Sequence, residues 1–552
     1  MSSAENTIAV IDPPQAAQAS SRRWLNALDR AVSALSERLN PILVKEARQA
    51  LKSKQFSITF ALVLACGWLW SMFGLAMFGP GLAYSSNGPG MFVGYYIVLA
   101  FPLLVIVPFS AFRSLASERE DGTYELLSIT TLRARQIIGG KLGSAVLQML
   151  VYFSAISPCL AFTYMLRGLD FPTIILTLFY TVLASLGLAV IGLLLATVTE
   201  EKHWQIVLSV ALIFALGLVF FMACTFVTEM VSWSRMDFQD PEFWIGNGAL
   251  LTGYGCYFAL AYCLAATQLM FASENRSTVP RIIMLVHQLM FVGWMAWAFS
   301  SDPQDEYVYA YLTVLGLHWY VMGVFLTGES SDLSPRVKRA LPQSFLGRAL
   351  FTWFNPGSGT GYLFSIANLF SGALIALVGF FAWYVYLFDA NLGLTVTNPN
   401  ALISFTALGF CYVVLYLGAG RLLMMLVSKA GSVSMQLHVL IHFLLLLAGC
   451  AIPVTIHLMS PSLRNDYSLI EFTNPIWTLI EVVDGPMMPE QLLALLIGLP
   501  LMAGIVFLLN LPSVAAEVRQ VRIAKPRRMV EEDAAIDAAL HPPEPVHTSP
   551  WD

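Results

Sequence analysis

The stretch 117-SEREDGTYELLSITTLRARQIIGGKLG-143 places seven charged side chains within its first nineteen residues, between two apolar runs. The rest of the chain is oily, because 57% of its 552 residues are hydrophobic and 12% are charged. Soluble domains carry about 25% charged residues. A charged segment in such a chain is expected to be a loop between membrane-spanning helices. The sequence therefore predicts an all-α polytopic membrane protein.

Twelve apolar runs are long enough to cross ~30 Å of hydrocarbon as helices. We expect spans near residues 56–78, 91–112, 145–166, 173–198, 205–229, 246–271, 282–299, 308–327, 365–387, 401–427, 435–458 and 492–511. The seven cysteines lie in or beside these runs and form no CxxC pair. This pattern favours small buried side chains over a metal site or a set of disulfides.

Basic residues are concentrated in every second loop and ahead of the first span. The alternate loops at 79–90, 300–307 and 389–400 are neutral or acidic. The positive-inside rule then puts both termini in the cytoplasm, with the protein in the inner (plasma) membrane. The tails at 1–33 and 512–552 are polar and rich in Pro, Ala or acidic residues, so we expect them to be disordered.

The segment 34–55, just before the first span, is predicted to form an amphipathic interfacial helix. Its core, 39-LNPILVKEARQALKSKQF-56, offers Asn40 as the N-cap and Pro41 at the first helical position. Lys45, Arg48 and Lys52 share one face and apolar residues the other, which is typical of a helix in the headgroup region. The alternative is a solvated lead-in to the span.

The opening stretch belongs to the predicted cytoplasmic loop 113–144. We expect Gly122 to end the helix that leaves the membrane, and Thr123 to cap a short helix that runs through Leu127. Thr131 would cap a second helix that runs into Gly139-Gly140-Lys141. Several loop residues are apolar although no lipid faces them, which indicates a protein contact: Tyr124, Leu126, Leu127, Ile129 and Leu132. A merely solvated loop is the alternative.

The loop and the lead-in together resemble the permease subunits of type-2 ABC transporters, the exporter family. The matching positions are Glu118, Glu120, Gly122, Thr123, Glu125, Leu126, Leu127, Thr130, Arg133, Ile137, Gly140 and Lys141 in the loop, and Asn40, Pro41, Glu46 and Arg48 in the lead-in. One departure is visible, since the family often has Pro after the Thr of the break and this chain has Leu132. The resemblance covers a six-span permease unit at 56–272. A second six-span region at 273–511 carries no such motif.

The resemblance implies that a separate cytoplasmic ATPase binds ATP and Mg, and that this chain is neither an enzyme nor the holder of a cofactor. Its coupling residues would be Glu118, Glu120, Gly122, Thr123, Glu125, Leu126, Leu127, Arg133 and Lys141. The chain agrees in having no G-x-x-x-x-G-K-[ST] phosphate loop. The implied partners are that P-loop ATPase, membrane lipid and a second permease, most simply another copy of this chain. No nucleic acid partner is expected.

The function implied is coupling of ATP hydrolysis to export of an unidentified cargo, for which the apolar span faces fit a hydrophobic or lipid-linked molecule. The alternative is a twelve-span secondary transporter, which fits the number of spans equally well. Such a transporter usually places a charged residue at mid-membrane for ion coupling. The charges of this chain lie towards the ends of its spans.

Three features outside the loop could carry chemistry. His438 and His442 are four residues apart, the spacing of a two-histidine metal site, but no third ligand is near in sequence, which favours helix–helix hydrogen bonding and no metal. Arg421 would snorkel to the cytoplasmic headgroups or grip an anionic substrate. The outer loop holds a short helix that begins at Asn474-Pro475 and is either re-entrant or interfacial.

The predicted topology can be tested by labelling single cysteines with a membrane-impermeant maleimide in a variant without the native cysteines. Ser86→Cys and Asp389→Cys should label in intact cells because they lie in the non-basic loops. Ser432→Cys should label only after the membrane is permeabilised. The reverse pattern would contradict the orientation.

Overall fold

The computed structural model describes residues 40–79, 87–122, 132–198, 201–233, 237–271, 274–302, 304–330, 334–342, 344, 346–347, 352–389, 399–429, 431, 434–459, 467–484, 487–519 and 526–540. Every regular element in these ranges is a helix. Twelve of the helices are long and apolar enough to cross a membrane, and each coincides with one of the predicted spans. The prediction of an all-α polytopic membrane protein is confirmed.

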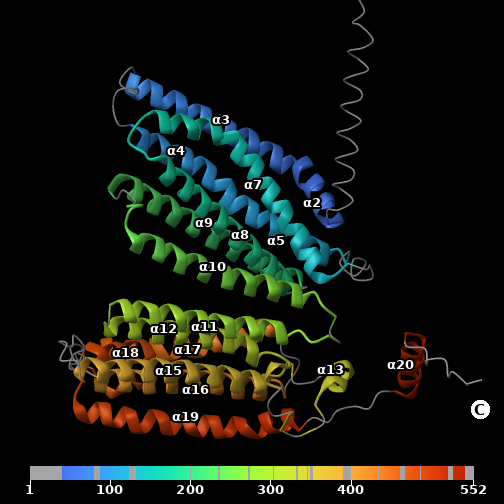
Figure 1. The fold of residues 1–552 in the computed structure, drawn as a ribbon, viewed down its shortest axis with the longest axis vertical. Helices are drawn as coiled ribbons and strands as arrows, with labels where there is room; N and C mark the ends of the chain where they lie inside the picture. Colours follow the sequence, from blue (N-terminus) through green and yellow to red (C-terminus); the bar gives the residue numbers. More distant parts are fainter. Residues whose placement is uncertain are drawn as a thin grey trace, which may run out of the picture. The chain divides into compact units, whose positions relative to one another are not determined.

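The chain forms two compact units, which can be followed by colour in Figure 1. Unit 1 comprises Met1–Phe243 and Ala261–Leu269, and unit 2 comprises Trp244–Leu260 and Met270–Asp552. The helix α10 (Pro241–Gln268) therefore contributes to both units. The other helices of unit 1 are α2 (Pro41–Lys52), α3 (Lys54–Phe78), α4 (Gly88–Phe101), η2 (Pro102–Ile106), α5 (Val107–Glu120), α7 (Ala134–Met165), α8 (Phe171–Val198) and α9 (Lys202–Trp233).

One span, built from α4, η2 and α5, is the core of unit 1. In its most apolar stretch 61% of the residues are buried, whereas in that of α9 only 11% are. Most of the other spans of unit 1 therefore expose large apolar faces. Phe92, Leu103 and Phe112 on the central span are fully buried. At its middle, the N–H of Val107 donates to the carbonyl of Pro102, five residues back, which makes a π-helical turn. The core span is thus continuous but irregular at one point.

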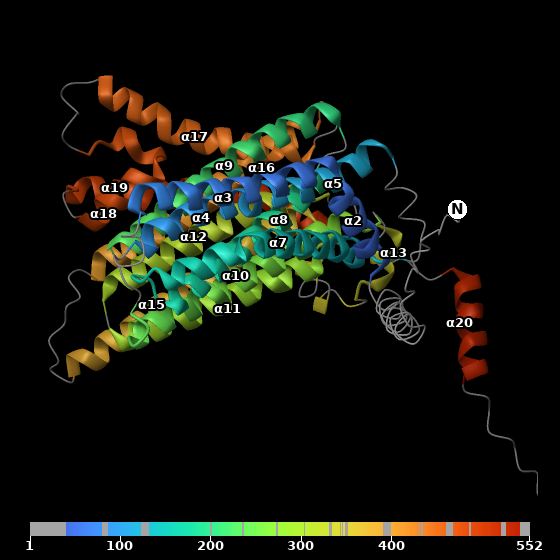
Figure 2. The same cartoon turned by 90° about the horizontal axis from the view of Figure 1, so that it is seen from above.

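The lead-in helix α2 packs along α7 within unit 1, as Figures 1 and 2 both show. Asn40 caps it as predicted, because its side chain accepts from the N–H of Ile42 at 3.1 Å, and Pro41 is the first helical residue. The amide of Asn40 also donates to the carbonyl of Gln136. Gly140 permits the close approach, since a Cβ there would lie 2.8 Å from the Cβ of Ile42.

The loop 113–144 differs in part from the expected arrangement. Gly122, with φ of 68°, follows the end of α5 and confirms the predicted helix break. The expected separate helix ending at Gly139-Gly140-Lys141 is instead the first part of α7, with Arg133 at the N-cap position. The helix continues through both glycines. Gly140 lies against Ile42 of α2, where a larger side chain would clash. Thr123–Thr131, including the two predicted caps, lie outside the described residues.

Unit 2 is organised around α16, whose most apolar stretch is 67% buried. Its helices are α11 (Thr278–Ser301), α12 (Asp305–Thr327), α13 (Pro335–Ala340), η3 (Thr352–Phe354), α15 (Ser358–Asp389), α16 (Pro399–Val427), α17 (Met435–Met459), η4 (Leu469–Thr473), α18 (Pro475–Asp484), α19 (Pro489–Val518) and α20 (Arg527–Leu540). The last of these lies in the tail that we expected to be disordered. Its Ala, Glu and Arg residues favour a helix, and its described side chains are exposed.

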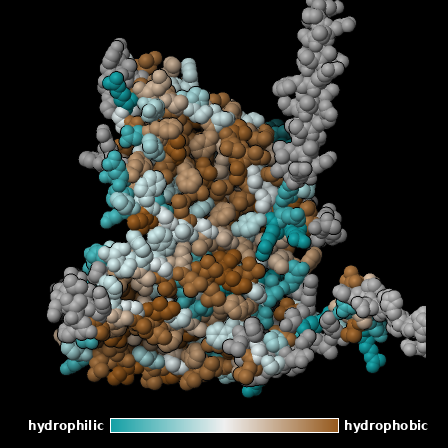
Figure 3. All heavy atoms as spheres, viewed as in Figure 1, coloured by the Kyte–Doolittle hydropathy of each residue, from teal (hydrophilic) through white to brown (hydrophobic). Residues whose placement is uncertain are grey.

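Apolar side chains cover much of the outer surface of the spans, and hydrophilic ones gather towards the helix ends (Figure 3). Exposed examples are Leu62, Leu69, Phe214 and Phe221 in unit 1, and Leu289, Leu317, Leu447 and Leu501 in unit 2. Such a surface is unfavourable in water and suits lipid. It supports the membrane assignment made from the twelve apolar helices.

Candidate functional site

A buried cluster of charges joins three helices at one end of unit 1. The ammonium of Lys141 on α7 lies 3.1 Å from Glu46 Oε1 on α2 and 2.9 Å from Glu118 Oε2 on α5. It also donates to the carbonyl and the hydroxyl of Ser114, both at 3.3 Å. The side chains of Lys141, Glu46 and Glu118 are 1%, 9% and 13% exposed. We call these three residues the inner charge cluster.

Surface residues extend the inner charge cluster. Lys45 donates to Glu118 Oε1 at 3.0 Å. Burial alone would lower the pKa of Lys45, but the hydrogen bond and the charge of Glu118 outweigh it and raise that pKa above its ordinary value. Arg119 donates to the carbonyls of Ala196 and Thr197 at the end of α8, the second at 2.5 Å. Both ends of the loop are therefore attached to neighbouring helices of unit 1.

The predicted coupling and lead-in residues fall into three sets. The first set comprises Glu46 and Lys141, which are buried, and Glu118, which is 13% exposed. The more accessible set is Asn40, Pro41, Arg48, Glu120, Gly122 and Arg133, of which Glu120 lies 3.5 Å from Lys202. The third set, Thr123, Glu125, Leu126 and Leu127, lies outside the described residues. The carboxyl of Glu118 thus faces into the protein, which its place in a charged stretch did not indicate.

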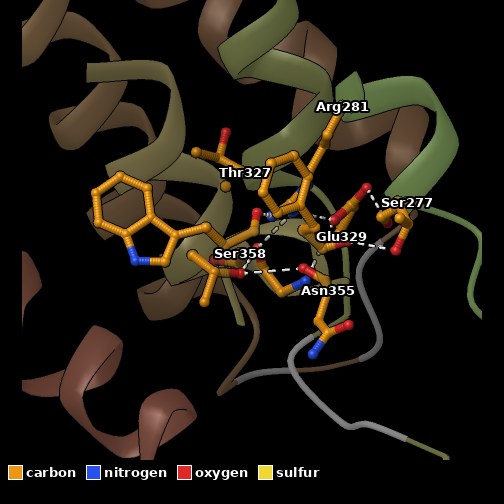
Figure 4. Close-up of polar contacts among 12 residues, drawn as sticks. Ser277, Arg281, Thr327, Glu329, Asn355 and Ser358 are labelled. Carbon is orange, nitrogen blue, oxygen red and sulfur yellow. Dashed lines mark hydrogen bonds and ion pairs between the residues drawn. The ribbon is translucent and has the colours of Figure 1, made fainter. Parts of the chain in front are cut away.

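Unit 2 holds a second set of buried ion pairs. Arg281 on α11 is fully buried and lies 2.6 Å from Glu329 Oε2. Figure 4 shows Ser277 and Arg281 directed at Glu329, and the Ser277 hydroxyl donates to Glu329 Oε1 at 2.5 Å. The N–H of Gly357 donates to Glu329 Oε2 at 3.2 Å. This group connects α11, the end of α12 and the segment before α15.

Arg421 on α16 is held inside unit 2. Its guanidinium donates to Ser358 Oγ at 2.7 Å and to Asn510 Oδ1 at 2.8 Å, and it lies 3.7 Å from Glu517 Oε1. Glu517 in turn accepts the N–H groups of Gly359 and Thr360 at 2.8 and 2.9 Å, which caps α15. At 2% exposure Arg421 does not snorkel, so that interpretation is wrong. Its donors are directed at protein groups.

His438 and His442 both face the interior of unit 2, at 3% and 1% exposure. His438 Nε2 lies 3.1 Å from Thr327 Oγ1 on α12, a helix–helix hydrogen bond of the kind expected. Within the described ranges, no three His, Cys, Asp or Glu residues come together as metal ligands would. Sequence spacing alone did not reveal which helix faces the imidazoles.

Comparisons of the chain with protein-family models, with curated proteins and with solved structures gave no match.

Lys141→Met should destabilise unit 1 by about 3–5 kcal/mol, because it leaves the buried carboxylate of Glu46 without its close cation, while Glu118 keeps Lys45. Lys202→Met is the matched control, since it removes an exposed ion pair worth about 1 kcal/mol or less. Thermal unfolding of the purified protein in mild detergent measures both. Equal melting temperatures for the two variants would contradict the role assigned to the inner charge cluster.

Proposed function

We propose that this chain is the membrane-spanning permease subunit of an ATP-driven exporter in the plasma membrane. The observation that carries the proposal is the inner charge cluster, which fixes both ends of the loop 113–144 on α2, α5 and α7. A loop held rigidly at both ends can pass a displacement to the helices that hold it. The resemblance to type-2 ABC permeases supports the same role for this loop.

In this proposal a soluble P-loop ATPase binds ATP and Mg and docks on the loop. Its contacts would be the accessible residues Glu120, Gly122 and Arg133 together with the apolar residues between them. A push on the loop moves α5, which continues through η2 into α4, the buried core of unit 1. The π turn at Pro102 is where that span can bend most readily. Glu118 and Lys141 act as positioning residues behind the docking surface.

A proton-coupled or other secondary transporter is the second candidate. One observation favours it, namely that unit 2 buries charged and titratable side chains along several spans: Arg281, His287, His318, Arg421, His438 and His442. Polar groups of this kind mark ion pathways in many membrane proteins. We rank the secondary transporter below the permease, because the loop of unit 1 carries the sequence resemblance to type-2 ABC permeases.

Glu120→Lys should weaken binding of the co-purifying P-loop ATPase about tenfold or more, because it reverses a charge on the proposed docking surface. The measurements are recovery of the ATPase with the full-length chain and ATP hydrolysis by the complex. Glu306→Lys, an exposed charge reversal at the first turn of α12, is the matched control and should change neither. A Glu120→Lys complex with unchanged recovery and hydrolysis would contradict the docking site.

The stoichiometry gives a further test. By the resemblance, an ABC engine needs a coupling loop for each of two ATPases, and the first half of the chain supplies one such pattern. We expect an active complex with two copies of this chain, or this chain and a related permease, joined through unit 1. Native mass measurement of the solubilised complex decides this. An active particle with one permease chain and two ATPases would place a second docking site in unit 2.

A further inference from the structure

The helix α17 of unit 2 has a buried face with three histidines and an exposed face of large apolar side chains. Its buried residues are His438, His442, Pro453 and His457. Large apolar side chains of the same helix are exposed, among them Leu440, Phe443, Leu444, Leu447 and Ile452. Polar side chains in a membrane face the bundle interior, where they need partners. The three imidazoles are therefore directed at α12, α16 and η4, which pack against α17.

The first imidazole stands beside the buried ion pairs. His438 Nε2 is 3.1 Å from Thr327 Oγ1, two residues before Glu329 of the Arg281 pair. The ring of His442 follows, with its centroid 4.8 Å from that of His438. Gly420 on α16 makes room for it, because a Cβ at that position would lie 2.2 Å from the His442 ring. The two imidazoles thus lie next to each other inside unit 2.

Two tyrosines continue the series beyond His442. The ring of Tyr320 on α12 has its centroid 6.4 Å from that of His442. The hydroxyl of Tyr416 on α16 lies against Gly449 of α17, where a Cβ would be 1.9 Å from it. Tyr416 donates to the carbonyl of Thr473 at 2.5 Å. Tyr416 therefore links α16 to η4 beside α17.

The far end is a buried acid and imidazole. Glu471 is fully buried, and its Oε1 lies 3.7 Å from Nδ1 of His457. Asn474 donates to the other carboxyl oxygen at 3.1 Å. Among the described residues, the ring nitrogens of His442 and His457 and Glu471 Oε1 have no hydrogen-bond partner. Buried polar atoms left unpaired are costly, and where a protein keeps them they call for an explanation.

We propose that these side chains form a proton pathway through unit 2, from Thr327 and His438 past His442, Tyr320 and Tyr416 to His457 and Glu471. An imidazole can take a proton on one nitrogen and release one from the other, and a hydroxyl or carboxyl can pass a proton on in the same way. The hydroxyls of Tyr320 and Tyr416 donate to the backbone carbonyls of His442 and Thr473, so each would rotate away from that carbonyl to pass a proton on. Ring rotation and bridging water would carry the proton across the steps longer than a hydrogen bond. Each group ends in its starting state, so a proton enters at one end and leaves at the other.

Protons fit this series better than other ions. Metal cations need several ligands around one point, and no such group of His, Cys, Asp or Glu exists in the described part of the chain. Other titratable or charged groups that interact with the series are Arg421 and Tyr412 from α16, Cys450 from α17 and Tyr467, which precedes η4. The proposal does not depend on ATPase docking, since it concerns unit 2 alone.

The test uses the full-length chain in potassium-loaded liposomes, in which valinomycin sets an inside-negative potential by outward diffusion of potassium, and a trapped pH-sensitive dye. We expect proton uptake above that of protein-free liposomes. His442→Phe, His442→Gln and Glu471→Gln should each reduce the initial rate about tenfold or more, because each interrupts the series. The Gln variants keep size and polarity, so they separate loss of relay from loss of packing.

His203→Phe is the matched control, since His203 is exposed in unit 1 and should leave the rate unchanged. Each variant is checked for wild-type elution and melting before it is assayed. Absence of uptake by the wild-type chain would overturn the proposal. Unchanged rates in the His442 and Glu471 variants, or an equal loss in His203→Phe, would overturn it too and leave the histidines as packing residues. Failure of this test leaves the ATPase-docking test untouched, because the docking residues lie in unit 1.

Discussion

The arrangement of unit 1 depends on one buried ammonium. Lys141 sits in a long apolar helix with 1% of its side chain exposed, and a charge in such a place must be paired. Glu46 and Glu118 provide the pairing from α2 and α5. That requirement brings the lead-in helix against α7, and it fixes where the charged loop leaves and re-enters the bundle. The proposed coupling role follows from this fixed geometry.

Unit 2 satisfies the same constraint at Arg281 and Arg421, and departs from it at the histidines of α17. The two arginines have carboxylate partners and several hydrogen bonds, so they fix α11, α12, α15, α16 and α19 to one another. His442 is equally buried, and its ring nitrogens have no hydrogen-bond partner among the described residues; His457 lies 3.7 Å from the Glu471 carboxyl without a hydrogen bond to it. Fully paired charges serve structure. Imidazoles without a hydrogen-bond partner are the groups that we propose carry protons.

Much of the fold could be predicted, because membrane spans appear in the sequence as apolar runs and helix ends as capping or breaking residues. Asn40 and Gly122 act within a few residues of sequence, and both behave as predicted. The inward turn of Glu118 could not be predicted, since its partners Lys141 and Lys45 lie on other helices. Likewise, the contact of Gly140 with Ile42 could not be predicted, because the two residues lie on different helices. Helices that are apolar all round do not tell which face meets protein.

The most direct test of the paired-charge account is the melting temperature of the double variant Lys141→Met/Glu46→Gln compared with Lys141→Met alone. Removing Glu46 as well leaves Lys45 and Glu118 as a balanced pair, 3.0 Å apart. The double variant should therefore melt at a higher temperature than the single one, because no buried carboxylate remains uncompensated. A double variant that melts lower, with the two losses simply adding, would contradict the account.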